Sequence, residues 1–352
     1  MFYAGLRSRV FNKIATMHLA YSELLALAET GLRSAGISAK TAHQTAQFLA
    51  LAELDGLASH GLSRVSQYAA HAKNGRVELA PKVKVKTFKS SAALVDAGDG
   101  LAFPALRLAT DLSVNLASKS GVGLVAVTNS HHFGVAGHYV EAAARAGYIS
   151  LLFGNTPAAM PMVGGSKAIF GTNPLAAAFP TGRGNPLVVD MSLSAVARGK
   201  LLIAAKKGES IPEGWALTAE GEPTTDPQQG LKGLMVPMGG DKGALLALII
   251  ELLVVGLSGS QFSYEADSFF DAKGNRPRIG QLILTIDAGL AGPGIFASKM
   301  HNFLQTLAAD AGTRLPGQRR FHQRESGLKQ GITISDVVVE EIQAGIRQSW
   351  TG

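Results

Sequence analysis

Three residues whose side chains handle protons and anions stand close together early in the chain: Ser59, His60 and Arg64. A histidine exchanges a proton near neutral pH, and the serine beside it can orient the ring or relay the proton. Arg64 follows His60 by four residues, which on a helix places both side chains on one face, and its guanidinium suits a carboxylate. The pattern indicates proton transfer beside a bound carboxylate. A helix cap at His60 with a solvated Arg64 would also explain it.

A second polar stretch, residues 129–133, directly follows a predicted strand. Small and polar residues at the carboxyl end of a strand are typical of ligand sites in α/β proteins. His131 and His132 in this stretch also suggest a metal site. Neighbours on a strand point to opposite sides, however, and no third ligand is evident, so we predict no bound metal.

Three further turns are candidates for anion binding. Residues 170–174 and 237–243 are glycine-rich, and the second precedes an apolar helix whose N-terminus could hold an anion through backbone N–H groups. Residues 314–320 form a compact basic turn that could take a cofactor phosphate. Ordinary turns and a basic surface loop would explain the same residues.

The composition narrows the class of protein. The 352 residues are 46% hydrophobic and 17% charged, which suits a large buried core. The absence of cysteine excludes disulfides, thiolate nucleophiles and cysteine metal sites. The net charge of +7 comes without a basic run interleaved with aromatic residues. We therefore predict no nucleic-acid partner, and an anionic ligand fits the charge equally well.

The longest apolar run covers residues 243–257 and carries Glu251 in its middle. It is shorter than a membrane span requires, and a central carboxylate is costly in a bilayer. We predict a buried core helix here, no membrane partner and a cytoplasmic location.

Hydrophobic periodicity predicts an α/β protein. Helices are expected over residues 22–36, 40–54 and 61–74, with Ser22 capping the first and Gly36 ending it. The alternation in residues 82–88 predicts a half-exposed strand. Further strands are predicted at residues 92–96, 123–128, 149–153, 187–190 and 281–286, and helices at 104–119, 138–146, 242–255 and through the last fifty residues.

One stretch, Gly121-Val-Gly123-Leu-Val-Ala126, matches the dinucleotide-binding fingerprint Gly-x-Gly-x-x-Ala. That motif must follow a strand and open a helix, so that the helix N-terminus faces the pyrophosphate. Here a predicted helix precedes Gly121 and the motif's second half is itself a strand. We interpret the match as a helix-to-strand turn and reject a standard Rossmann domain.

Together these segments resemble the malate/L-lactate dehydrogenase family that is unrelated in fold to the better-known enzymes of those names. The resemblance spans about residues 21–343. The segments that carry it are Ser59-His60-Gly61-x-x-Arg64, Ser130-His131-His132-Phe133, Phe170-Gly171-Thr172-Asn173-Pro174, Val189-Asp190-Met191-Ser192, Gly239-Gly240-x-Lys242-Gly243 and Arg314-Leu315-Pro316-Gly317.

The resemblance implies an α/β, non-Rossmann NAD(P)-binding fold with a helical flanking domain, in a homodimer. His60 would be the proton donor, Ser59 its relay partner, and Arg64 and Thr172 would contact a small carboxylate substrate. The implied domains are residues 17–78 with 300–352, helical and for substrate and dimerisation, and 79–299, α/β and for the cofactor. Residues 1–16 are expected to be an extension outside the fold, with Met17 as a plausible natural start.

The resemblance also implies where the cofactor binds. NADPH is favoured over NADH because Arg314, Arg319 and Arg320 could hold a 2′-phosphate. The implied contacts are His132, Phe133, Gly134, Val135, Ala136, Asp190, Met191, Ser192, Gly240, Asp241, Leu315, Pro316, Gly317, Gln318, Arg319, Arg320 and Phe321.

Members of this family differ in substrate. Residues 261–284 resemble the branch that reduces the cyclic imines Δ1-piperideine-2-carboxylate and Δ1-pyrroline-2-carboxylate to pipecolate and proline, and we expect that activity. Lys200 stands where that branch has a relay carboxylate, and Asp241 where it has histidine. Both departures favour a dehydrogenase of malate, lactate, sulfolactate or ureidoglycolate instead. A catalytically inactive nucleotide-binding homologue and a metal hydrolase using His131 and His132 are also compatible with these residues.

Overall fold

The computed structural model describes residues 16–350, and a seven-stranded sheet lies at its centre. The strand order is β2-β3-β4-β13-β5-β8-β9, in which β3 and β4 are parallel and all other neighbours are antiparallel. This mainly antiparallel order is not that of a Rossmann sheet. The strands are β2 (Lys84–Lys89), β3 (Ala92–Asp96), β4 (Val122–Ser130), β5 (Tyr148–Gly154), β8 (Leu175–Phe179), β9 (Leu187–Met191) and β13 (Ile279–Asp287).

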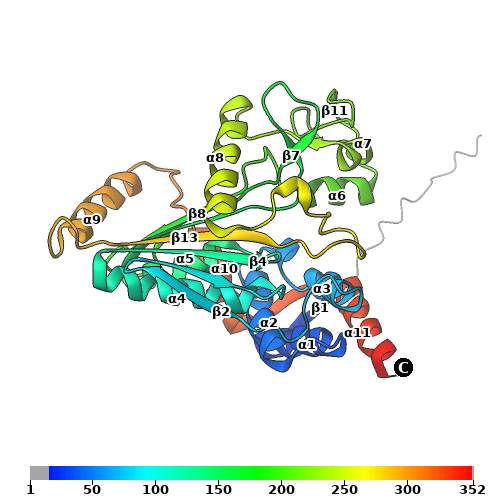
Figure 1. Ribbon diagram of the computed structural model, residues 1–352, viewed down its shortest axis with the longest axis horizontal. Helices are drawn as coiled ribbons and strands as arrows, with labels where there is room; N and C mark the ends of the chain where they lie inside the picture. Colours follow the sequence, from blue (N-terminus) through cyan, green and yellow to red (C-terminus); the bar gives the residue numbers. More distant parts are fainter. Residues whose placement is uncertain (1–15, 351–352) are drawn as a thin grey trace, which may run out of the picture.

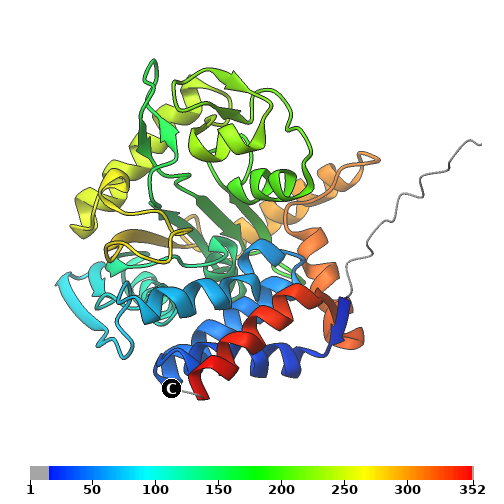
Figure 2. The same ribbon diagram turned by 90° about the vertical axis from the view of Figure 1, so that its right-hand side faces the viewer.

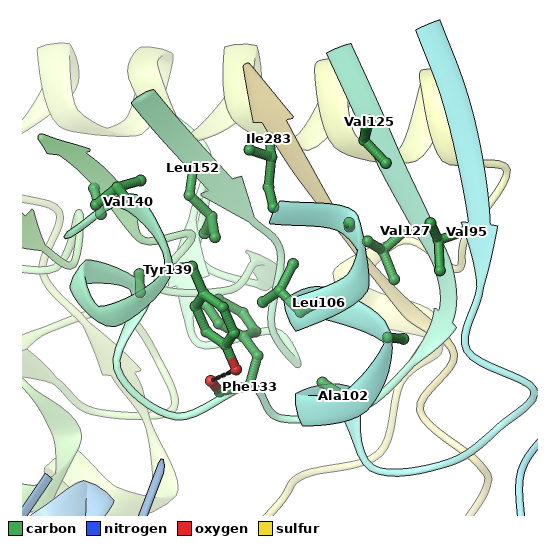
Figure 3. Close-up of a cluster of buried hydrophobic side chains, with 14 of the residues drawn as sticks. Val95, Ala102, Leu106, Val125, Val127, Phe133, Tyr139, Val140, Leu152 and Ile283 are labelled. Carbon is green, nitrogen blue, oxygen red and sulfur yellow. Dashed lines mark hydrogen bonds between the residues drawn. The ribbon is translucent and has the colours of Figure 1, made fainter. Parts of the chain in front are cut away.

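Helices cover both faces of this sheet (Figure 1). On one face lie α4 (Ala102–Ser120) and α5 (Ala136–Arg145), and on the other lies α8 (Asp241–Ser258). Successive strand side chains point to opposite faces, so Val125 and Val127 pack toward α4 and α5 while Ala126 packs toward α8. Figure 3 shows the first of these cores, with Leu106 of α4 against the strands.

A helical body flanks the sheet and joins the two ends of the described chain (Figure 2). It contains α1 (Tyr21–Ser34), α2 (Ala39–Leu54), α3 (Ser63–Lys73), α10 (Gln318–Gln330) and α11 (Asp336–Trp350). A two-stranded ladder pairs β1 (Thr16–Leu19) with β14 (Ile332–Ser335). Leu24, Leu49 and Tyr68 are fully buried in its core together with Ile342 from α11.

Above the sheet in Figure 1, short elements form a smaller lobe, while α9 (Ile295–Ala308) projects away from the body and buries none of its side chains. The elements of the lobe are β6 (Met160–Pro161), β7 (Ala168–Phe170), α6 (Arg198–Lys207), β10 (Ala216–Leu217), β11 (Pro223–Thr224), α7 (Pro227–Lys232) and β12 (Leu234–Met235). Two 3-10 turns, η1 (Ala58–His60) and η2 (Ser263–Glu265), lie in the connecting segments.

All six sheet strands expected from the sequence are present, but the exposure of one strand, a seventh strand and one helix cap were not predicted correctly. Strand β2 is exposed along its whole length rather than half-exposed, because it is the edge of the sheet and nothing covers either face. Strand β8 was not predicted, since its Leu-Ala-Ala-Ala-Phe sequence has little β-propensity. Helix α1 begins at Tyr21, so Ser22 is not its cap, whereas Gly36 follows its end with a φ of +88° as expected.

The prediction of a buried core helix at residues 243–257 was correct for the helix but wrong for one of its faces. Leu245, Ile249, Leu252 and Leu257 form an exposed stripe on α8, while Ala247, Ile250 and Val254 pack on the sheet. The run is apolar all round, so periodicity alone did not separate the two faces. No helix in the described part of the chain is long and apolar enough to span a membrane.

Glu251 explains the single acid in this apolar helix. Its side chain is 2% exposed and accepts hydrogen bonds from the Ser263 backbone N–H (2.7 Å), the Ser263 hydroxyl (2.7 Å) and the Asn173 amide (2.8 Å). A buried carboxylate is tolerated only when donors satisfy it in this way. Glu251 therefore connects α8 to the loop that carries Thr172 and to the turn η2 within residues 261–278.

We predict that Glu251→Ala lowers the free energy of unfolding by about 3 kcal/mol or more, because buried donors on Ser263 and Asn173 lose their acceptor. The midpoint of urea denaturation measures this change. Glu340→Ala, an exposed position on α11, is the control and should change the midpoint little. Equal midpoints for the two variants would contradict the role assigned to Glu251.

Candidate active site

A cavity of about 300 Å³ lies between the sheet, the helical body and the smaller lobe. It collects most of the residues that the sequence singled out, although they come from five separate segments. Its lining includes Ser59, His60, Arg64, Thr172, His132–Ala136, Asp190–Ser192 and Arg320. A cavity of this size suits a small-molecule ligand.

The turn η1 presents Ser59 and His60 to the cavity. The Ser59 hydroxyl and the His60 Nδ1 atom are 3.0 Å apart. Gly61 follows with no side chain, since a Cβ there would meet the Glu53 carboxylate at 2.1 Å. That carboxylate accepts the Leu62 N–H at 2.7 Å, and burial raises the pKa of Glu53 to about 7. The Glu53 carboxylate thus holds the backbone of the turn and leaves no space for a side chain at Gly61.

Arg64 contacts the same turn, but not through the shared helical face that its spacing suggested. His60 belongs to η1 and Arg64 to α3, so the expectation that the two share one helical face was wrong. Instead the Arg64 Nε donates to the Ser59 carbonyl at 2.7 Å, and Nη1 donates to Gln67 at 2.7 Å. The Gln67 amide in turn donates to the Phe269 carbonyl. The guanidinium is held beside His60 with other donors still available.

His60 is neutral at physiological pH in this arrangement. Burial, followed by the nearby charges of Arg64 and His138, lowers its pKa to about 4. A pKa this low makes the ring a weak base. An anion bound to Arg64 offsets one cause of the lowered pKa, so the pKa of His60 rises and the ring takes up a proton more readily.

The adjacent histidines contact different partners. His132 Nδ1 lies 2.6 Å from the Tyr68 hydroxyl, and His131 Nε2 lies 3.0 Å from His71 Nδ1. Burial lowers the pKa of His131 and His132 well below the usual value and that of His71 to about 4. Across residues 16–350, no group of three His, Cys, Asp or Glu residues could hold a metal ion.

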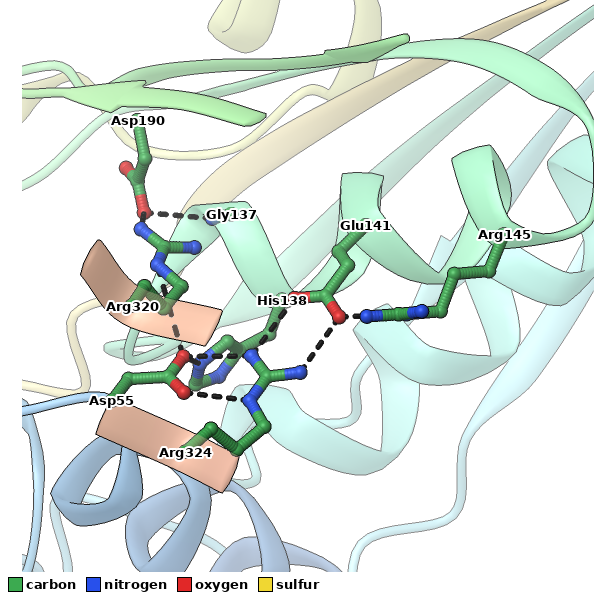
Figure 4. Close-up of polar contacts among 8 residues, drawn as sticks. All are labelled: Asp55, Gly137, His138, Glu141, Arg145, Asp190, Arg320 and Arg324. Carbon is green, nitrogen blue, oxygen red and sulfur yellow. Dashed lines mark hydrogen bonds and ion pairs between the residues drawn. The ribbon is translucent and has the colours of Figure 1, made fainter. Parts of the chain in front are cut away.

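An ion-pair network supports the cavity from the side of the helical body (Figure 4). The fully buried Asp55 carboxylate accepts two hydrogen bonds from Arg324, at 2.7 and 2.8 Å, and lies 2.8 Å from His138 Nε2. Arg320 lies between this network and the cavity, 3.7 Å from Asp55 and 3.3 Å from Asp190. The Asp190 carboxylate also accepts the Gly137 N–H at 2.8 Å. The ion pair between Arg320 and Asp190 therefore connects α10 to the wall of the cavity.

Several residues with predicted cofactor contacts lie outside this cavity. Gly240 and Asp241 are exposed at the start of α8. Leu315, Pro316, Gln318 and Phe321 instead line a second cavity of about 360 Å³ beside residues 181–187. Gly317 and Arg319 line neither cavity, and Arg314 and Arg319 are exposed.

Comparison with known proteins settles the family. Residues 19–343 match the family model described as malate/L-lactate dehydrogenase. The chain belongs to the malate/L-lactate dehydrogenase family. A (2R)-3-sulfolactate dehydrogenase (NADP(+)) from Chromohalobacter salexigens is 44% identical over 93% of this chain and 97% of its own length. The predicted family and its oxidoreductase class are thereby confirmed.

Two further relatives act on different substrates. A Δ1-pyrroline-2-carboxylate/Δ1-piperideine-2-carboxylate reductase from Pseudomonas putida is 35% identical over 91% of this chain and 94% of its own. The crystal structure of the Δ1-piperideine-2-carboxylate reductase from Pseudomonas syringae pv. tomato matches with a TM-score of 0.88 at 33% identity, covering 94% of this chain and 100% of that one. The non-Rossmann fold expected for the family is confirmed.

In this member of the malate/L-lactate dehydrogenase family, Lys200 does not line the cavity. Its ammonium lies 5.5 Å from the centre of the Trp215 ring. Gly199 of α6 lies beside Ser59, since a Cβ added to it would be 3.7 Å from that of Ser59. No carboxylate among the described residues hydrogen-bonds to Ser59, whose hydroxyl contacts His60.

Arg198, Phe269 and Phe270 line the cavity of this family member but were missed in the sequence. Arg198 is the first residue of α6, and the two phenylalanines lie in the irregular segment 261–278. Arg76, which is fully buried, holds that segment through bonds to the carbonyls of residues 267, 268, 271 and 275. The adjacent phenylalanines were the one available signal in the sequence. Their spacing is not typical of any binding motif, so they did not indicate a site.

The histidines in and beside the cavity predict how stability depends on pH. Four of them, His60, His71, His131 and His132, have a pKa lower in the folded chain than the unfolded value of 6.5, so each gains a proton on unfolding near pH 5.5. Glu53, with its raised pKa, loses one. The unfolded state therefore binds more protons overall, and stability falls as the pH drops from about 6.5 toward 4.

Each net proton contributes about 1.4 kcal/mol per pH unit to the slope of the unfolding free energy against pH. Urea denaturation at several pH values between 7 and 5 measures this slope. His71→Gln should make the slope shallower by roughly one proton. His301→Gln, at an exposed position on α9, should leave it unchanged. Stability that is constant from pH 7 to 5 would contradict the neutral state of these rings.

Proposed function

We propose that the chain transfers a hydride between NADPH and the carbon next to the carboxylate of a small acid, interconverting a 2-hydroxy acid and a 2-oxo acid. The observation that carries this proposal is the meeting of Ser59, His60 and Arg64 in one cavity with the loops at residues 132–136 and 190–192. Proton transfer, carboxylate binding and cofactor binding are thereby brought within reach of one another.

The residues present fit a nicotinamide cofactor. Gly134 has a φ of +70° and, with Val135 and Ala136, forms a smooth wall at the N-terminus of α5. Arg320 has a buried Nη1 atom that makes no hydrogen bond in the described part of the chain, so a donor is available for an anionic or carbonyl group. NADPH is further supported by the NADP(+) named for the relative from Chromohalobacter salexigens. The cofactor supplies or accepts the hydride when bound.

The protein's own groups bind the substrate and move its proton. Arg64 holds the carboxylate through the guanidinium donors left free by Ser59 and Gln67, which orients the neighbouring carbon. Neutral His60 accepts the hydroxyl proton during oxidation. In reduction, the carboxylate on Arg64 raises the pKa of His60, and the protonated ring returns the proton to the oxygen. Ser59 keeps the ring in place through its contact with Nδ1.

The reduction of cyclic imines, which the sequence favoured, is the second candidate. It is supported by the likeness to the reductase from Pseudomonas syringae pv. tomato and by residues 261–284. The hydroxy acid is preferred because Lys200 stands where a relay carboxylate was expected and points toward Trp215. The 44% identity to a sulfolactate dehydrogenase supports the same choice.

A panel of substrates tests the proposal, with oxaloacetate, pyruvate, 3-sulfopyruvate, Δ1-pyrroline-2-carboxylate and Δ1-piperideine-2-carboxylate each followed by loss of NADPH or NADH absorbance. We expect turnover of at least one 2-oxo acid, with a higher kcat/KM for NADPH than for NADH. Turnover of the imines alone would select the second candidate. No turnover, with NADPH fluorescence still showing binding, would identify an inactive nucleotide-binding homologue.

Two variants test the assigned roles on the best substrate of the panel. His60→Ala should lower kcat by about 100-fold or more, since general acid–base catalysis contributes on that scale. Arg64→Ala should chiefly raise KM for the carboxylate substrate. Normal kinetics in either variant would remove that residue from the proposed mechanism.

We also propose that the chain forms a homodimer, through the exposed stripe of Leu245, Ile249, Leu252 and Leu257 on α8 in place of the helical domain that the resemblance implied. The stripe runs along one side of the helix for its whole length, and contiguous apolar surface of this kind is typical of subunit contacts. A second copy presents the same stripe, which suits a two-fold symmetric contact. The cytoplasmic location remains a prediction.

Light scattering after gel filtration should give the mass of a dimer for the unchanged chain and of a monomer for Ile249→Lys, because a lysine would be buried without a partner in the contact. Val337→Lys, at a similarly exposed apolar position on α11, is the control and should remain dimeric. A monomeric unchanged chain, or a dimer unaffected by Ile249→Lys, would overturn this interface.

A further inference from the structure

Two arginines share one aromatic ring in the wall of the cavity. The guanidinium carbon of Arg64 lies 5.7 Å from the centre of the Phe270 ring, and that of Arg198 lies 5.6 Å from the same centre. The two guanidinium carbons are therefore separated by at most about twice the distance from either of them to the ring centre. They come from different bodies of the protein, Arg64 from α3 and Arg198 from the start of α6.

Neither arginine is matched by an acid. Arg64 donates to the Ser59 carbonyl and to Gln67, and Arg198 donates to the Leu231 carbonyl at 2.6 Å. Burial lowers the pKa of both, and Asp271, although close enough to raise that of Arg198, forms no ion pair with it in residues 16–350. The one carboxylate of the cavity lining, Asp190, is paired with Arg320. The cavity thus has two unpaired positive charges.

A substrate with one carboxylate neutralises one of these charges. The other would remain partly buried without a counter-ion, which is unfavourable. A cyclic imine in its protonated form would add a third positive charge beside them. A chain of three or four carbons with an anionic group at each end would instead neutralise both, each through charge-assisted hydrogen bonds of about 2.8 Å.

We propose that Arg198 binds a second anionic group of the substrate, a carboxylate or sulfonate at the end remote from the carboxylate that Arg64 binds. This inference rests on the proposed function of the same cavity and narrows its substrate to dianionic 2-hydroxy and 2-oxo acids. Phe270 sets the separation of the two cations. Arg76 fixes Phe270 in turn, since it binds the backbone on both sides of that residue.

The kinetic test compares a dianion with a monoanion in Arg198→Met, which keeps the length of the side chain and removes its charge. We expect kcat/KM for oxaloacetate or 3-sulfopyruvate to fall by about 100-fold, mainly through KM, because a charged hydrogen-bonded contact is lost. The value for pyruvate should change less than about threefold. Lys200→Met, two residues along the same helix and outside the cavity, is the control and should alter neither value.

Equal losses for the dianion and for pyruvate would overturn the proposal. A rise in the KM for NADPH with unchanged preference between the two acids would overturn it too, since Arg198 would then contact the cofactor. Binding of unreactive acids provides a readout that does not depend on turnover. By calorimetry, succinate should bind the unchanged chain about 100-fold more tightly than butyrate, and Arg198→Met should abolish that difference.

This second measurement separates the two proposals. If no substrate is turned over but succinate still binds through Arg198, the proposed reaction fails while the dianion site stands. If an oxo acid is turned over and succinate shows no advantage over butyrate, the reaction stands while the role of Arg198 is wrong.

Discussion

The buried Asp55 carboxylate is the interaction on which the arrangement of the layers depends. It lies at the end of α2, only a few residues before Ser59, and it binds Arg324 of α10 and His138 of α5. Removing a carboxylate from water is costly, and these hydrogen-bonded partners offset that cost. Because each partner belongs to a different layer, the layers must meet correctly before the charge is satisfied. The geometry of the cavity is therefore set by an ion-pair network that is not itself part of the cavity.

The sequence predicted the elements whose pattern is local. Strands β4 and β13 alternate or are rich in branched residues, and α4 and α5 have clear helical spacing, so each was recognised. Strand β8 was not, because three alanines in a row favour neither pattern strongly. The exposed stripe on α8 was also beyond prediction, since a helix that is apolar all round does not reveal which face the sheet covers.

The site shows the same division between local and distant information. His60 and Arg64 were identified from one short stretch, and they do lie together, but through a backbone carbonyl rather than a shared helical face. Arg198 and Phe270 lie far from that stretch in the sequence, and only the packing of Arg76 against the segment 261–278 brings Phe270 over both guanidinium groups. Contacts of this kind depend on tertiary packing, so neither periodicity nor short motifs could reveal them.

The pairing of β1 with β14 also determines when the molecule can finish folding. Thr16 pairs with Ser335, so almost the whole chain must be synthesised between the two strands before the ladder can form. At about 5–20 residues per second, that interval is of the order of half a minute. Until then α1, whose Leu24 and Leu32 belong to this core, lacks its contact with α11. The helical body that carries His60 is therefore completed only after the strands of the central sheet have been synthesised.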